Sequence, residues 1–168
     1  MFDDEIRHKV SSLLKACRAK GLHISTAESC TGGLIAAALT EISGSSDVFE
    51  RGFVTYQDDA KAENLGVSRH TLTAHGAVSE PVAREMAAGT LDRSTSQVSV
   101  AVTGIAGPGG GSPQKPVGLV HIASASNEGA SHHRRCEFGE IGREGIRDAT
   151  IREALDMLTE IVAAYPSG

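Results

Sequence analysis

The chain has 168 residues, of which 40% are hydrophobic and 22% are charged, and this composition is typical of one folded domain with a full hydrophobic core. Its formal net charge of -5 argues against a protein that binds nucleic acid, because such binding depends on lysine and arginine neutralising phosphates. The sequence also contains no apolar stretch long enough for a signal peptide or a membrane span. We therefore expect a cytoplasmic protein that contacts neither nucleic acid nor a membrane.

The three cysteines predict neither disulfides nor a metal site. Cys17, Cys30 and Cys136 are odd in number and form no C-x-x-C pair, which is typical of a reducing compartment. His132 and His133 are neighbours and would point to opposite faces of an extended segment. We expect no metal and no cofactor.

The first third of the chain predicts a helix, a strand and a second helix. Asp3 or Asp4 can cap a helix with apolar residues at helical spacing, and Gly21 can end it. A strand is expected over residues 22–27. Residues 32–42 are apolar almost all round, which predicts a buried helix.

The middle of the chain predicts a strand and two further helices. Residues 53–56 are expected to form the strand, and Asp58 or Asp59 to cap a short helix through 61–65. A second helix should start at Ser79, its N-cap, and bury a stripe of three side chains. These side chains are Val82, Met86 and Leu91.

The remaining elements complete a mixed sheet. Alternating valines predict a strand over 98–102, and the glycine-rich run 103–113 predicts a loop. Residues 119–125 and 131–138 are expected to form an antiparallel pair, followed by a helix from about Arg143. This order predicts a single α/β domain over residues 1–168, a three-layer α/β/α sandwich with a mixed β-sheet.

The junction between the first strand and the buried helix is the first candidate for chemistry. A hydroxyl held near a helix N-terminus can bind an anion, or attack a carbonyl whose oxyanion is stabilised nearby. Ser29 is our candidate nucleophile, and a simple helix cap is the alternative. Cys30 could compete if its thiol pKa were lowered, or could be a small buried apolar residue.

Three other features could assist such a serine. Lys61 could act as its base if burial lowered the pKa of the amine, and Tyr56 could relay the proton or be a core aromatic residue. The glycine-rich loop could supply N–H groups to an anion or be a plain flexible loop. Arg143 and Arg147 lie one helical turn apart and could clamp a phosphate or form a solvated helix face.

Five motifs in order along the chain resemble one known family. They are Thr26-Ala27-Glu28-Ser29-Cys30-Thr31-Gly32-Gly33, then Thr55-Tyr56 with Lys61 and Leu65-Gly66-Val67, then Gly76-Ala77-Val78-Ser79, then Thr103-Gly104-Ile105-Ala106-Gly107-Pro108, and Lys115-Pro116-Val117-Gly118. Together they resemble the C-terminal domain of the competence/damage-inducible CinA family, whose stand-alone members are nicotinamide-nucleotide amidohydrolases. The resemblance spans most of the chain.

The resemblance implies that the chain is an amidohydrolase. The expected reaction converts nicotinamide mononucleotide and water to nicotinate mononucleotide and ammonia, with Ser29 as nucleophile and Tyr56 and Lys61 as its polar partners. The expected substrate-binding set is Cys30, Thr31, Gly32, Thr103, Gly104, Ile105, Gly107 and Arg143. The sequence departs from the family's Gly-Asp-Arg before the last helix, where it has Ile141-Gly142-Arg143 and so keeps only the arginine.

Two alternatives to this activity stay open at this stage. One is a catalytically silent module that binds a pyridine nucleotide or a partner in competence or damage responses. The other is a Ser/Lys hydrolase of peptides or lactams, which would need no phosphate site. The small-residue helix 33–39 and an exposed sheet edge also leave room for self-association, so we expect a homo-oligomer.

Overall fold

A computed structural model describes residues 2–166 and contains one five-stranded sheet. The elements in chain order are α1 (Asp4–Lys20), β1 (Ile24–Glu28), α2 (Leu34–Glu41), a 3-10 turn η1 (Ser45–Asp47), β2 (Phe49–Val54), α3 (Asp58–Leu65), α4 (Arg69–His75), α5 (Glu80–Asp92), β3 (Val98–Gly104), β4 (Leu119–Ser126), β5 (Ser131–Glu137) and α6 (Gly142–Ala164). Among the described residues, no helix is long and apolar enough to cross a membrane.

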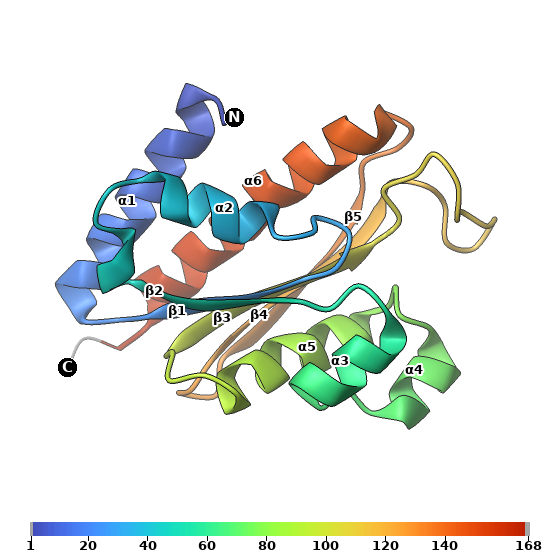
Figure 1. Ribbon diagram of the computed structural model, residues 1–168, viewed down its shortest axis with the longest axis horizontal. Coiled ribbons are helices and arrows are strands. Elements are labelled where there is room, and N and C mark those ends of the chain that lie inside the picture. The colour runs from blue at the N-terminus through green and yellow to red at the C-terminus, as the bar shows by residue number, and fades with distance from the viewer. Residues whose placement is uncertain (1, 167–168) are drawn as a thin grey trace.

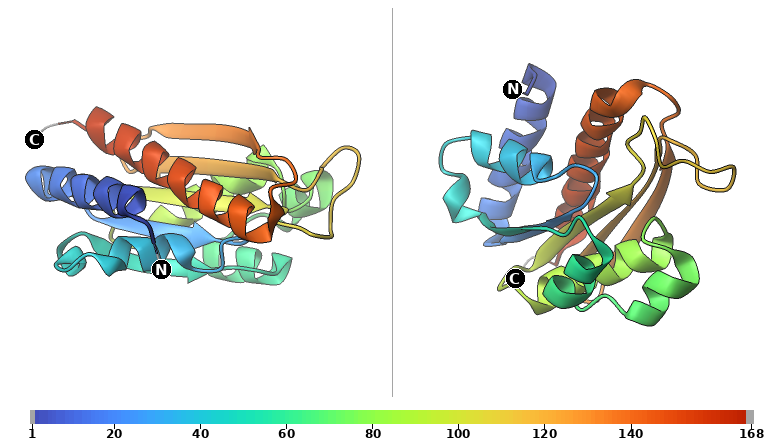
Figure 2. Two further views of the ribbon diagram at one scale, coloured as in Figure 1. Left: turned by 90° about the horizontal axis from the view of Figure 1, so that it is seen from above. Right: turned by 45° about the vertical axis from the view of Figure 1, so that its right-hand side comes forward.

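The sheet is mixed and has helices on both faces, as predicted. Its strand order is β2-β1-β3-β4-β5, with β1 parallel to β2 and β3, and β4 antiparallel to β3 and β5. Helices α1, α2 and α6 cover one face, and α3, α4 and α5 cover the other (Figures 1 and 2). The expected α/β/α sandwich is confirmed.

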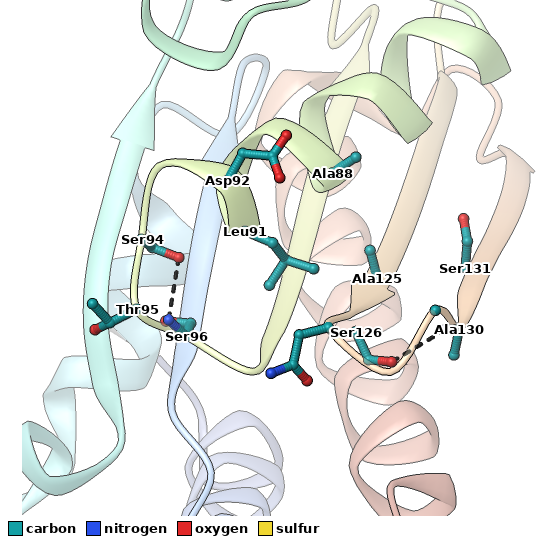
Figure 3. A pocket seen from close by; sticks show the side chains of 12 residues that line it. Ala88, Leu91, Asp92, Ser94, Thr95, Ser96, Ala125, Ser126, Ala130 and Ser131 are labelled. Atoms are coloured by element: carbon teal, nitrogen blue, oxygen red, sulfur yellow. Dashed lines mark hydrogen bonds between the residues drawn. The ribbon is translucent and has the colours of Figure 1, made fainter.

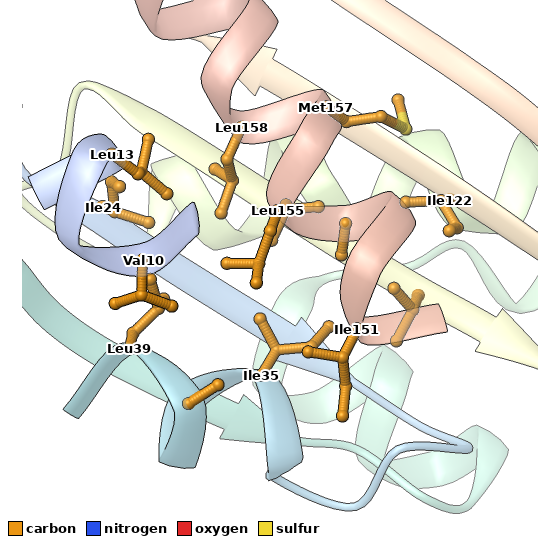
Figure 4. Packing of buried hydrophobic residues seen from close by; sticks show 14 of the residues in the cluster. Val10, Leu13, Ile24, Ile35, Leu39, Ile122, Ile151, Leu155, Met157 and Leu158 are labelled. Carbon is orange, nitrogen blue, oxygen red and sulfur yellow. The ribbon is translucent and has the colours of Figure 1, made fainter. Parts of the chain in front are cut away.

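Two apolar clusters hold the three layers together. The larger lies under α1, α2 and α6, where Ile24 and Ile122 of the sheet meet Ile35, Leu155 and the other helix side chains (Figure 4). The smaller lies under α3, α4 and α5 and contains many alanines, including Ala101 and Ala123. Alternation along each strand sends one set of side chains to each cluster.

Most predicted elements form, but several boundaries and caps were wrong. The strand predicted over 53–56 is β2, which ends at Val54, and the helix predicted over 32–42 begins at Leu34. Gln57, and neither Asp58 nor Asp59, is the N-cap residue of α3, so the two aspartates occupy the first helical turn.

The helix that follows Ser79 also differs in detail from the prediction. Ser79 does precede α5, but its hydroxyl donates to the carbonyl of Gly76 instead of accepting from the helix. Val82 and Met86 are fully buried, whereas Leu91 is only half-buried. Helix α4 and the turn η1 were not predicted, because each is short and has few apolar residues to mark it.

Candidate active site

The candidate site lies where β1 and β2 end and α6 begins. The turn 29–33 after β1, the segment 55–57 after β2 and the loop 105–117 after β3 all emerge from the same end of the sheet (Figure 1). The parallel strands β1, β2 and β3 place their carboxyl ends together, which is where open α/β sheets commonly bind ligands.

Ser29 directly follows β1 and faces the layer that contains α3. Its N–H donates to the carbonyl of Val102 at 3.1 Å, and its carbonyl accepts from the N–H of Gly32 at 3.0 Å. The side chain is 8% exposed. Ser29 lies five residues before the first residue of α2, and the N-cap is Gly33, so Ser29 is not the cap of that helix.

Lys61 projects from α3 and brings its amine to Ser29. Its Nζ lies 3.3 Å from the Oγ of Ser29, 2.9 Å from the carbonyl oxygen of Thr55 and 3.3 Å from that of Tyr56. The residue is 1% exposed, and within residues 2–166 no carboxylate lies within salt-bridge distance of the amine. Burial lowers the pKa of Lys61, and the more distant charge of Asp58 opposes this shift only in part.

Tyr56 contributes to this centre through its backbone. Its ring is 55% exposed, so it is not the core aromatic residue that we considered as an alternative. Its hydroxyl accepts from the Nη2 of Arg143 at 3.2 Å, and among the described residues no hydrogen bond joins that hydroxyl to Ser29 or Lys61. The proton relay through Tyr56 that the sequence suggested has no hydrogen-bonded path here.

Cys30 is not placed as a nucleophile. Its side chain is 5% exposed and belongs to the larger apolar cluster. Burial raises the pKa of the thiol to about 12, the opposite of the lowered value that a reactive cysteine would need. The buried apolar alternative is the one that the structure supports.

Helix α6 supplies two arginines to the same end of the sheet. Arg143 donates from Nη1 to the carbonyl of Gly107 at 2.9 Å and from Nη2 to Tyr56, so it ties the glycine-rich loop to the segment after β2. Arg147, one turn later, donates from Nη2 to the carbonyl of Thr31 at 2.9 Å. Both side chains line a cavity of about 460 Å³ together with Phe2, Leu34 and Ile151.

Comparison with known proteins identifies the chain. A model of the CinA C-terminal domain matches residues 5–162. The chain belongs to the CinA C-terminal domain family. It is 48% identical over 154 residues to a protein named nicotinamide-nucleotide amidohydrolase PncC from Escherichia coli K12, covering 92% of this chain and 90% of that protein.

Solved structures of the CinA family share the fold. The competence/damage inducible protein CihA from Agrobacterium tumefaciens has a TM-score of 0.95 at 54% identity, covering 96% of this chain and 98% of that one. The competence damage-inducible protein A from Klebsiella pneumoniae has a TM-score of 0.90 at 35% identity, covering 96% and 99%. The predicted family membership is confirmed.

Several residues that the CinA resemblance placed in the substrate-binding set have structural roles in this fold. Thr103 is 1% exposed and its hydroxyl donates to the carbonyl of Ala77, and the Ile105 N–H donates to the carbonyl of Leu119. A Cβ on Gly104 would lie 2.6 Å from Val120, so this glycine allows close strand packing. Gly32 has a φ of 62°, which the turn requires and which favours glycine.

Glu28 is the residue of this site whose role the sequence analysis missed. It is fully buried, and its carboxylate accepts from the Thr31 hydroxyl at 2.7 Å and from the N–H groups of Ile35 and Ala36 at 2.8 and 3.0 Å. These two N–H groups belong to the first turn of α2, so the helix N-terminus that we expected to face a ligand is occupied by Glu28. One signal could have revealed this role. Gly33, the N-cap of α2, has no side chain to accept from the helix N–H groups, so the acceptor had to come from another residue.

A second cavity, larger than the one lined by Arg143 and Arg147, lies away from this site. It measures about 600 Å³ and is formed by the end of α5, the segment 94–96 and the β4–β5 hairpin (Figure 3). Two of its hydroxyl oxygens accept from nearby backbone N–H groups, Ser94 from Ser96 and Ser126 from Ala130. Within the described residues, no group of three or more His, Cys, Asp or Glu side chains is placed to hold a metal ion.

Proposed function

We propose that this chain is a nicotinamide-nucleotide amidohydrolase in which Ser29 is the nucleophile and Lys61 is its base. The observation that carries the proposal is the 3.3 Å separation between the Lys61 Nζ and the Ser29 Oγ at a buried position. Relatives across nearly the whole chain bear the name of that activity. A serine and an amine in contact form a nucleophile and base pair suited to amide hydrolysis.

The neighbours of Lys61 support the role of a base. The carbonyl oxygens of Thr55 and Tyr56 can only accept hydrogen bonds, so they take both N–H bonds of a neutral amine. The lone pair of that amine then faces the Ser29 hydroxyl. Burial favours the neutral form of Lys61, because it disfavours the ammonium.

The chemistry follows from this pair. The Ser29 Oγ attacks the carboxamide carbon of nicotinamide mononucleotide while its proton moves to the Lys61 amine. The resulting ammonium returns this proton to the amide nitrogen, the C–N bond breaks, and ammonia leaves an ester on Ser29. Water then attacks this ester, again with Lys61 as base, and releases nicotinate mononucleotide and the free serine.

Backbone N–H groups of the turn are available to stabilise the oxyanion. Among residues 2–166, the N–H groups of Cys30 and Thr31 donate to no acceptor in another residue, whereas those of Ser29 and Gly32 do. N–H groups that follow a nucleophilic serine are common donors to an oxyanion. We assign this role to Cys30 and Thr31 through their backbones, since the Thr31 hydroxyl is held by Glu28.

Arg143 and Tyr56 are suited to the nucleotide. Arg143 is exposed and makes no ion pair with a carboxylate among the described residues, so its guanidinium can bind the substrate's phosphate. The exposed Tyr56 ring beside it offers an apolar face to the nicotinamide. Both the Arg143 guanidinium and the Tyr56 ring come from one chain, so we expect the site to need no group from a second copy. The homo-oligomer stays a prediction.

The test is ammonia release from nicotinamide mononucleotide by the purified chain. We expect turnover in the wild type and none in Ser29→Ala, with unchanged circular dichroism, because this side chain is small and its removal leaves no large void. Ser126→Ala, another nearly buried serine at 7% exposure, is the matched control and should keep full activity. Binding without ammonia release in the wild type would favour the silent pyridine-nucleotide module instead.

A further inference from the structure

Thr31 in the turn after Ser29 is held from two opposite sides. Its hydroxyl donates to the Glu28 carboxylate at 2.7 Å, and its carbonyl accepts from the Arg147 guanidinium at 2.9 Å. Glu28 comes from the end of β1 and Arg147 from α6, so the turn is fastened both to the sheet and to a helix far away in the sequence.

The Glu28 carboxylate is committed entirely to this local structure. It is fully buried, and within the described residues no basic side chain lies within salt-bridge distance of it. Three donors satisfy it, one from Thr31 and two from the first turn of α2. A buried charge of this kind is stable only with well-placed donors, so Glu28 fixes the position of the turn relative to α2.

Arg147 is arranged as a clamp on the turn rather than as a free anion-binding group. Besides its Nη2 bond to Thr31, its Nε is buried and has no hydrogen-bond partner. It makes no ion pair with a carboxylate in the part of the chain that the structure describes, unlike its neighbour Arg152, which pairs with three. The Nε is thus shielded from solvent while the Nη2 holds a backbone carbonyl.

We propose that Glu28, Thr31 and Arg147 are positioning residues for the amidohydrolase reaction. They hold the peptide units of Cys30 and Thr31 so that both unpaired N–H groups face the oxyanion that forms at Ser29. This inference rests on the proposed function. It also assigns Arg147 a role different from binding the substrate's phosphate, which is left to Arg143.

The physical reason is that oxyanion stabilisation depends steeply on donor placement. Loss of one such donor commonly costs about 10²- to 10³-fold in kcat, and a shift of about 1 Å in an active site can cost about 10²-fold. Because these donors act on the transition state, their displacement should lower kcat and leave KM nearly unchanged.

The first test replaces the threonine. Thr31→Val keeps the shape and removes the hydroxyl, and we expect kcat to fall roughly 10- to 100-fold with KM within about 2-fold. Thr31→Ser retains the hydroxyl and should recover most of the loss. The matched control is Thr150→Val, an equally buried threonine on α6 whose hydroxyl donates to Ile146, and it should keep wild-type kcat. Wild-type kcat in a folded Thr31→Val would overturn the proposal.

The second test distinguishes a positioning role of Arg147 from the phosphate-binding role assigned to Arg143. Arg147→Met should lower kcat by a similar factor with KM little changed, and Arg147→Lys should recover part of it. A rise in KM of about tenfold or more with kcat retained would instead make Arg147 a phosphate ligand and overturn its positioning role. Arg152→Met, on the same helix, controls for the loss of an arginine.

Hydrogen exchange measures the turn without any substrate. We expect the amides of residues 30–36 to exchange faster in Thr31→Val and Arg147→Met than in the wild type, and Thr150→Val to leave this segment unchanged. Unaltered exchange in both variants would contradict the claim that Thr31 and Arg147 hold this turn in place. If the wild type released no ammonia, the proposed function would fail, and the exchange result would still decide whether these residues fix the turn.

Discussion

The Nζ of Lys61 lies 3.3 Å from the Oγ of Ser29, and its other two polar neighbours are carbonyl oxygens that can only accept hydrogen bonds. The two protonation states of the Lys61 amine would make different hydrogen bonds in this arrangement. An ammonium would donate to all three oxygens, whereas a neutral amine donates to the carbonyls and accepts from the serine. Burial lowers the pKa of Lys61 and so favours the reactive state.

The first prediction concerns the pH dependence of activity. Because Lys61 must be neutral to accept the serine proton, kcat/KM should rise with pH through a group whose pKa lies below the ordinary lysine value of 10.5. Lys61→Arg stays protonated and should lose roughly 10³-fold in kcat/KM. A pH profile of ammonia release from pH 5 to 10 checks both, and an unchanged profile in Lys61→Arg would exclude Lys61 as the base.

The same lysine should affect stability. In the window between the lowered folded pKa and 10.5, the unfolded chain binds a proton at this site and the folded chain does not, so stability rises with pH across that window. Lys61→Met removes this contribution. Urea unfolding between pH 7 and 10 should therefore show a steeper rise for the wild type than for Lys61→Met, and parallel curves would contradict the assignment.

The cysteines should be dispensable and unreactive. Burial raises the thiol pKa to about 12 for Cys17 and Cys30 and to about 11 for Cys136. We expect iodoacetamide at pH 7.5 to leave ammonia release intact and Cys30→Ala to retain most of kcat, at a stability cost on the order of 1 kcal/mol. Rapid inactivation by the reagent, prevented by substrate, would indicate a catalytic thiol.

Arg143 should affect substrate binding through the phosphate. Arg143→Gln should raise KM for nicotinamide mononucleotide about tenfold or more while kcat changes little, because the guanidinium bonds to Gly107 and Tyr56 and, among the described residues, to neither Ser29 nor Lys61. The variant should discriminate less than the wild type between this substrate and its dephosphorylated form. Equal discrimination in both proteins would place the phosphate elsewhere.

A stacked histidine pair predicts acid sensitivity. The Nδ1 of His121 lies 2.9 Å from the Nε2 of His133, with the rings stacked, and burial, aided by the charge of His133, lowers the pKa of His121 to about 4. Glu80 faces His133 at 3.5 Å and opposes this shift, while Arg135 and Lys115 add to it. The unfolded chain binds more protons here between pH 6.5 and about 4, so stability falls as pH falls through that window.

Replacement of His121 tests whether stability falls with pH in this direction. In His121→Gln the unfolding free energy should depend less on pH between 6.5 and 4, by an amount on the order of 3 kcal/mol over the full window. Urea titrations at both ends of the window measure the difference. A wild-type protein as stable at pH 4 as at pH 6.5 would contradict the pKa direction.

The sequence predicted the layers well because they depend on periodicity. The spacing of Ile6, Val10 and Leu13 marked α1, and the alternation of Val98, Val100 and Val102 marked β3, as the structure confirms. Caps and short helices were less predictable, since a capping acceptor can come from any nearby segment. Glu28 lies seven residues before its α2 partner Ile35, and no helical cap rule looks that far back.

The sequence pointed to the residues of the candidate site, but it did not show which contacts each of them makes. Local sequence and then the motif resemblance pointed to Ser29, Lys61 and Arg143, but only the structure shows that Lys61 is buried beside Ser29 and that the Tyr56 hydroxyl accepts from Arg143. The commitment of Thr31 and Thr103 to internal acceptors likewise depends on tertiary packing. Side-chain contacts between distant segments produce no periodic pattern in the sequence, so they could not be predicted from it.

The pleat of β1 separates two groups that would interfere with each other. Glu28 and Ser29 are consecutive, so they point to opposite faces, and the carboxylate lies under α2 while the hydroxyl meets the amine of α3. A shift of the strand by one residue would bring the carboxylate to Lys61, where an ion pair would stabilise the ammonium and remove the base. The change of face between Glu28 and Ser29 at the end of β1 thus keeps a carboxylate away from an amine that must stay neutral.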